Sequence, residues 1–165
     1  MPRKKGKALK KIIDTLLYYG ENNILSTQDD IRRLQGWIEK VETRPRLAIR
    51  YMKRKTQRKY STLEKEIAKE LEIFERTGES TGRLKEFQDD KISRGQKSLK
   101  VAEIRLKRYE RDLVLLKTNP RPVIERRMER MGGSLYTLCV DALKELVIIE
   151  RKQKLEKINK RLKDQ

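Results

Sequence analysis

Apolar residues recur at the spacing of α-helices through most of the chain, and no segment shows the alternation of a β-strand. The first apolar stripe predicts a helix over residues 7–19, which Gly20 would end in the left-handed conformation that glycine favours. A second stripe predicts a helix over residues 27–42. The polar residues 21–23 would form the loop between these two helices.

Two longer amphipathic segments follow, residues 45–76 and residues 83–117, on either side of a Gly-rich and Thr-rich turn. Their matched lengths predict a long antiparallel helical hairpin, with Gly95 as the point at which the second arm could break. In the second arm the apolar residues alternate at steps of three and four, as in a coiled coil: Leu99, Ala102, Leu106, Tyr109, Leu113 and Leu116.

The residues Asn119 to Pro122 end the hairpin, because a proline in the interior of a helix lacks the N–H group for the helical hydrogen bond and breaks the helix. A short helix over 123–131 and a last helix capped by Ser134 complete the chain. The expected fold is all-α, an extended helical bundle with a long antiparallel hairpin and a basic N-terminal arm. We expect one cooperative unit built from three segments: 1–43 (arm and two short helices), 44–118 (basic helix and hairpin) and 119–165 (C-terminal helices packing on the bundle).

Positive charge is concentrated in two tracts that contain no Asp or Glu. The chain has 43 Lys and Arg against 25 Asp and Glu, a net charge of +18. A tract this cationic repels itself unless a polyanion lies alongside, and phosphates bound by Lys or Arg release condensed counterions. The alternative is a solvated face balanced by acids elsewhere in the fold. The candidate nucleic-acid-binding residues are Arg3, Lys4, Lys5, Lys7, Lys10 and Lys11 in one tract, and Arg44, Arg46, Arg50, Lys53, Arg54, Lys55, Arg58 and Lys59 in the other.

Three aromatic residues are candidates for stacking on bases: Tyr51 and Tyr60 among the cations, and Trp37 shortly before them. Each also falls on or beside an apolar stripe, so packing in the core is the alternative role. The excess of Lys and Arg over amide side chains predicts contacts with the nucleic-acid backbone rather than sequence readout.

The residues that usually carry catalysis are scarce. The chain has no His, which removes the commonest general base and metal ligand. The single cysteine, Cys139, lies on an apolar helical face and is expected to be a buried structural thiol. The pairs Asp29-Asp30 and Asp89-Asp90 are expected to be caps or solvated charges rather than metal ligands, and Gly132 to Ser134 a cap rather than a phosphate loop. We therefore expect no enzyme activity, no cofactor and no metal.

The chain shows neither a membrane span nor a secretory signal. No run approaches 18 apolar residues, and the cationic start lacks a cleavage site. A lone cysteine cannot form an internal disulfide, which fits a reducing compartment. The expected location is intracellular or within a nucleoprotein particle, a virion included.

These patterns together predict a non-enzymatic structural protein that coats or packages nucleic acid through its phosphates, with DNA favoured over RNA. Apolar residues this sparse are more easily stabilised by homo- or hetero-oligomer formation. The architecture is similar to that of helical coat proteins of filamentous viruses or of chromatin-like proteins, although no motif identifies a family. The alternatives are an oligomeric DNA-packaging or assembly adaptor, such as a viral small packaging subunit, and a ribonucleoprotein component.

Overall fold

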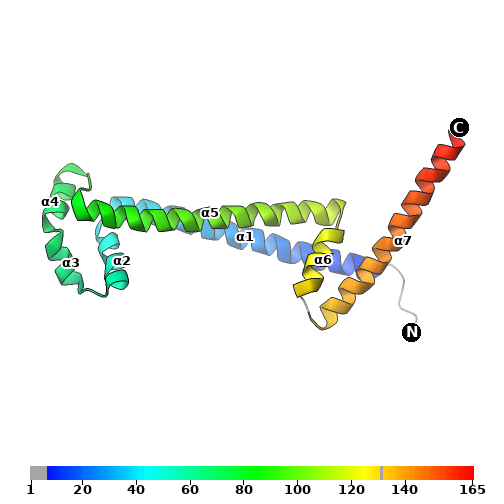
Figure 1. The fold of residues 1–165 in the computed structure, drawn as a ribbon, viewed down its shortest axis with the longest axis horizontal. Helices are drawn as coiled ribbons and strands as arrows, with labels where there is room; N and C mark the ends of the chain where they lie inside the picture. Colours follow the sequence, from blue (N-terminus) through cyan, green and yellow to red (C-terminus); the bar gives the residue numbers. More distant parts are fainter. Residues whose placement is uncertain (1–6, 131) are drawn as a thin grey trace. The chain divides into compact units, whose positions relative to one another are not determined.

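The computed structural model describes residues 7–130 and 132–165, and in these ranges the chain forms seven helices and no strand. This confirms the all-α bundle with a long antiparallel hairpin (Figure 1). The cations Arg3, Lys4 and Lys5 of the N-terminal arm lie outside the described residues. The helices are α1 (Lys7–Thr43), α2 (Arg46–Thr56), α3 (Tyr60–Glu66), α4 (Ala68–Thr77), α5 (Gly82–Thr118), α6 (Arg121–Arg130) and α7 (Ser134–Lys163).

The hairpin has a different first arm from the one expected. Its arms are α1 and α5, each 37 residues long, which run side by side in opposite directions (Figure 1). Residues 45–76 instead form three short helices, because Gln57 adopts a left-handed conformation with φ of 55° and Ile67 leaves helical geometry with φ of −115°. The second arm was predicted to within one residue at each end.

The expected helix end at Gly20 and the expected loop at residues 21–23 were wrong, because α1 continues through them without a break. Gly20 serves close helix packing rather than a helix end: a Cβ atom there would lie 3.2 Å from Cδ2 of Leu113 in α5. Gly95 likewise does not break α5, and a Cβ there would lie 2.9 Å from Cγ1 of Ile38 in α1. Both glycines let the backbones of α1 and α5 approach closely.

The chain divides into two compact units, each with its own core. Unit 1 comprises Met1–Leu25 and Lys107–Gln165, and unit 2 comprises Ser26–Leu106, so α1 and α5 contribute to both. The buried core of unit 1 is Ile12, Leu16, Leu116, Val123, Ile124, Cys139, Ala142 and Leu146. The buried core of unit 2 is Ala48, Ile49, Leu63, Ile67, Leu71, Leu84 and Phe87.

Cys139 is fully buried in the core of unit 1, which confirms the prediction of a buried thiol. Burial raises the pKa of this thiol, because the apolar surroundings disfavour the charged thiolate. The thiolate is the nucleophilic form of cysteine. The side chain therefore contributes to packing.

The second half of α7 buries none of its residues. Every residue from Glu150 to Gln165 is exposed, including Leu155, Ile158 and Leu162. Within the described ranges, no helix combines the length and apolar character that a bilayer crossing needs. Leu155, Ile158 and Leu162 form an exposed apolar stripe on this half of α7, whose other residues are nearly all polar.

In unit 2, a buried glutamine satisfies a backbone carbonyl at the end of α1. Val41 is four residues before Pro45, which has no N–H group to donate back to the Val41 carbonyl. The Gln88 side chain in α5 supplies the missing donor, with Nε2 2.9 Å from that carbonyl oxygen. The hydroxyl of Ser80 donates to Oε1 of the same glutamine. Gln88 therefore joins the end of α1, the start of α5 and the turn before α5.

In unit 1, a carboxylate from α7 caps the start of α1. Glu145 accepts a hydrogen bond from Ala8 N through Oε1 at 3.2 Å, and from Leu9 N through Oε2 at 2.9 Å. The first N–H groups of a helix have no partner within the helix, and the helix dipole favours a negative charge there. Glu145 therefore acts as an N-terminal cap of α1, although it lies far from α1 in the sequence.

Replacing Glu145 by alanine should lower the free energy of unfolding by about 1–2 kcal/mol, the usual effect of losing a helix cap. Glu145→Gln keeps one of the two acceptor oxygens and loses the charge, so it should cost less than Glu145→Ala. Glu156, exposed on the same helix, offers a matched control in Glu156→Ala. Urea titration followed by circular dichroism measures the three variants. Equal midpoints for Glu145→Ala and Glu156→Ala would show that the cap contributes no stability.

Candidate nucleic-acid interface

Most of the basic tract of unit 2 lies on α2, whose apolar side faces the core. Ala48 and Ile49 are fully buried there, and Met52 packs against the same cluster. The exposed side carries Arg50, Lys53 and Arg54. The helix is thus anchored by a narrow apolar edge and presents cations to solvent.

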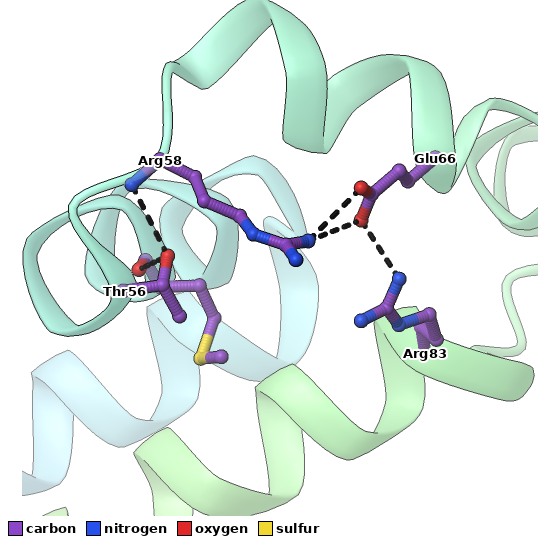
Figure 2. Close-up of polar contacts among 5 residues, drawn as sticks. Thr56, Arg58, Glu66 and Arg83 are labelled. Atoms are coloured by element: carbon purple, nitrogen blue, oxygen red, sulfur yellow. Dashed lines mark hydrogen bonds and ion pairs between the residues drawn. The ribbon is translucent and has the colours of Figure 1, made fainter.

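The tract does not remain helical to its end. Thr56 closes α2, with its hydroxyl donating to the Met52 carbonyl at 2.7 Å and accepting from Arg58 N at 3.4 Å (Figure 2). In the turn that follows, Arg58 Nη1 donates to both carboxylate oxygens of Glu66, at 3.0 and 3.3 Å. Arg83 from α5 donates to the same carboxylate at 2.7 Å (Figure 2). Arg58 is therefore held by a carboxylate of the chain itself.

Three of the eight cations between residues 44 and 59, a segment that the structure describes in full, form ion pairs within the chain. Arg46 pairs with Glu64, Lys55 pairs with Asp90 at 2.9 Å, and Arg58 pairs with Glu66. The remaining five have no carboxylate partner: Arg44, Arg50, Lys53, Arg54 and Lys59. Acids elsewhere in the fold therefore balance three of the eight cations, and they do not balance the other five.

Two further cations, Lys91 and Arg94 of α5, join α2 at an aromatic cluster. Lys91 Nζ lies 4.6 Å from the ring centroid of Tyr51 and 5.4 Å from that of Trp37. The Arg94 guanidinium carbon lies 5.4 Å from the Tyr51 centroid. The pKa of Lys91 is lowered, first by burial and then by the charges of Arg54 and Arg94. We call Arg54, Lys91 and Arg94, with Tyr51 and Trp37, the cation–aromatic cluster.

One side of this cluster is neutralised and the other is not. The pKa of Asp90 is lowered mainly by the hydrogen bond from Lys55. The Tyr51 hydroxyl is buried beside the Asp90 carboxylate, and its pKa is raised first by burial and then by that carboxylate. Arg54, Lys91 and Arg94 form no ion pair with a carboxylate within unit 2, which the structure describes throughout, although the charge of Arg94 also helps to lower the pKa of Asp90. An anion placed beside these three side chains would relieve their mutual repulsion.

Lys91 and Arg94 were missed by the sequence analysis. They lie three residues apart and therefore on one face of α5, which is a weak signal in a chain with this many cations. Only the packing of α5 beside α2 brings them to Tyr51. Their proximity to the basic tract is a tertiary property.

The other two aromatic candidates differ in exposure. Trp37 is 38% exposed, so one part of its ring is open to solvent. Tyr60 is half-buried and packs against the core of unit 2, which is the alternative role considered for it. Tyr51 is half-buried between the cations described above.

A groove of about 400 Å³ lies beside the start of α2, on the side away from the turn at Gln57. Its charged lining is Arg44, Arg46, Arg50 and one carboxylate, Glu75, and its apolar lining includes Leu47 and Phe74. Cations along the rim of an apolar groove suit a ligand with charged phosphates and less polar sugars or bases.

The described part of the N-terminal tract belongs to unit 1. Lys7, Lys10 and Lys11 lie in the first two turns of α1, and none forms an ion pair with a carboxylate among the described residues. The two basic tracts therefore belong to different compact units.

The described residues contain no group of three potential metal-ligating side chains. Asp29 pairs with Arg32 at 3.2 Å, and Asp90 pairs with Lys55, so one member of each acidic pair balances a nearby cation. Gly133, with φ of 70°, precedes α7, and Ser134 is the first helical residue rather than the cap expected from sequence. No protein-family model, curated protein or solved structure matches this chain.

Proposed function

We propose that this chain is a non-enzymatic nucleic-acid-binding structural protein, which coats or packages DNA or RNA as a multimer through contacts with the phosphate backbone. The observation that carries the proposal is the set of five unpaired cations at residues 44–59, extended by Lys91 and Arg94. Seven cations without an ion pair to a carboxylate, all within one compact unit on α2, on the residues that flank α2 and on α5, favour a polyanion as the ligand.

The chemistry of these residues supports backbone contacts. Lys and Arg bind phosphates without reading base sequence. Tyr51 and Trp37 lie next to the cations, where an aromatic ring can stack on a base of either type of nucleic acid. The chain would therefore bind many sequences with similar affinity.

The multimer part of the proposal is supported by the exposed stripe on the second half of α7. Leu155, Ile158 and Leu162 are spaced by three and four residues, which is the spacing of a coiled-coil seam. The partner that fits such a seam is the same helix of a second copy. Several cations share this half of α7, so a bound polyanion would favour association by reducing repulsion between copies.

The proposal predicts a steep salt dependence of binding to duplex DNA of random sequence. If the seven cations of unit 2 each neutralise one phosphate, the slope of log K against log salt should be roughly −6. Affinity should then fall by about 10³–10⁴-fold between 50 and 200 mM salt. Fluorescence anisotropy with labelled duplexes of two unrelated sequences measures both the slope and the sequence preference. A slope near zero, or a strong preference for one sequence, would contradict backbone binding.

Electron microscopy of the saturated complex tests the multimer. Continuous coating should give filaments whose length follows the length of the DNA, and Leu155→Ser with Leu162→Ser should shorten or abolish them without changing the salt slope. Closed rings of fixed size would instead favour the packaging-adaptor alternative. Isolated protein molecules on the DNA at saturation would contradict the multimer.

A further inference from the structure

Unit 1 contains a small cavity whose lining is rich in arginine. The cavity has a volume of about 170 Å³ and lies between the first half of α1, the end of α5 and α6. Its apolar wall comes from leucines of α1 and α5 and from Val123 of α6. Its charged lining consists of Arg108, Arg126, Arg127, Arg130 and Asp112. None of these residues belongs to the candidate interface of unit 2.

Only one of the four arginines is paired with a carboxylate within the described residues. Arg126 donates to Asp112 at 2.6 Å, and so offsets the one acid of the lining. Arg108, Arg127 and Arg130 have no such partner. The guanidinium of Arg108 lies 5.8 Å from the ring of its neighbour Tyr109, which helps to orient it. The cavity is therefore surrounded by four cations and one anion.

A simpler role explains part of this arrangement. Arg127 and Arg130 lie in the last turn of α6, where cations interact favourably with the helix dipole. That role does not account for Arg108, which comes from a different helix and lines the same cavity. Unpaired arginines from two helices that line the same cavity are typical of an anion site.

We propose that this cavity binds a single phosphate group, held by Arg108, Arg127 and Arg130. The inference does not depend on the proposed nucleic-acid interface, because it rests on other residues in the other unit.

The size and the residue type both favour phosphate. Pockets for drug-sized ligands measure about 300–1,000 Å³, so a cavity of about 170 Å³ suits a small anion rather than a whole nucleotide. All four cations are arginines, and the planar guanidinium forms paired hydrogen bonds with phosphate oxygens in a way that lysine cannot. A phosphate dianion would also offset most of the local excess of positive charge.

Isothermal titration of the full-length chain with inorganic phosphate at pH 7.5 and constant ionic strength tests the proposal. We expect saturable binding of one phosphate per chain, with chloride giving no comparable signal. Arg127→Gln and Arg130→Gln should each weaken binding by about tenfold, the effect of losing a charge-assisted hydrogen bond. Arg130 is exposed, so its variant gives a result even if Arg127→Gln disturbs folding.

Two further variants distinguish a specific phosphate site from non-specific attraction of phosphate to a positively charged chain. Arg127→Lys keeps the charge but loses the paired hydrogen bonds, so it should bind phosphate more weakly than the unmodified chain. Arg151→Gln removes an exposed charge of α7 outside the cavity and should have no effect. Equal affinity in Arg127→Lys, or an equal loss in Arg151→Gln, would overturn the proposal.

The source of the phosphate is distinguished with single-stranded oligonucleotides carrying or lacking a 5′-phosphate. If the cavity takes a nucleic-acid end, the 5′-phosphate should increase affinity, and Arg130→Gln should remove only that increase. If it takes free phosphate, inorganic phosphate should bind while the 5′-phosphate adds nothing. Binding of neither would overturn the proposal and leave the salt-dependent duplex binding of unit 2 unaffected.

Discussion

Replacing Arg50, Lys53 and Arg54 together by glutamate should abolish nucleic-acid binding while the helical content of the chain stays unchanged. All three side chains are exposed and have no carboxylate partner, so their replacement breaks no ion pair within unit 2. Three cations that would each bind a phosphate are replaced by three charges that repel it. We expect the affinity to fall by at least about 100-fold at 100 mM salt. Arg58 is unsuitable for this test, because its reversal would place a second carboxylate beside Glu66.

The matched control is reversal of three other exposed lysines of unit 2, Lys65, Lys69 and Lys85. It changes the net charge of the chain by the same amount. Anisotropy measurements should show a much smaller loss of affinity for this control, and circular dichroism should show equal helicity in both variants. If the two triple variants lose affinity equally, net charge rather than α2 determines binding.

The same assay tests the cation–aromatic cluster. Neutralising Lys91 and Arg94 by glutamine should weaken binding to all sequences alike. It should also reduce the magnitude of the salt slope by about 2, because two phosphates would no longer be neutralised. An unchanged slope would remove α5 from the interface and leave the cations of residues 44–59 as its only contributors in unit 2.

Replacing Gln88 by leucine should lower the free energy of unfolding by about 2–3 kcal/mol. Leucine fills a similar volume but cannot donate to the Val41 carbonyl, which Pro45 also leaves without a partner. A buried carbonyl without a hydrogen bond costs about 1–3 kcal/mol, and the hydroxyl of Ser80 loses its acceptor as well. Urea unfolding followed by circular dichroism gives the free energy.

A second substitution tests the cause of this destabilisation. Pro45 has helical backbone angles, with φ of −61° and ψ of −24°, so alanine fits there and supplies the N–H that proline lacks. The preceding N–H, of Arg44, already donates to the Lys40 carbonyl at 2.8 Å, which places the next N–H near the carbonyl of Val41. Pro45→Ala should therefore recover about 1 kcal/mol or more in the Gln88→Leu background and have little effect alone. Strict additivity of the two changes would show that the Val41 carbonyl is not the source of the destabilisation.

Helical periodicity was enough to predict the all-α fold, the long helix over residues 83–117 and the burial of Cys139. It failed where distant contacts overrule local preference. Gly20 and the polar residues after it are a loop signal in isolation, yet packing of Gly20 against Leu113 keeps α1 continuous. The break after α2 involves Arg58 and Arg83, which meet at Glu66 from positions far apart in the sequence.

The candidate site shows the same division. The cations of residues 44–59 can be found from sequence because an acid-free tract is a local property. The sequence does not show which of these cations form ion pairs, because the carboxylates that neutralise Arg46, Lys55 and Arg58 come from α3 and α5. The contribution of Lys91 and Arg94 depends on the same tertiary packing.

Because Gly95 has no side chain, it fixes the register in which α1 and α5 pack against one another. A shift by one helical turn, about 5.4 Å, would bring Lys91 or Leu99 opposite Ile38, where the fit already excludes a single methyl group. Trp37 adjoins Ile38, and Lys91 lies one turn before Gly95, so the same restraint keeps the indole ring beside the lysine. Gly95 would not contact a ligand itself, yet it fixes the alignment of Trp37 and Lys91, which belong to the proposed interface.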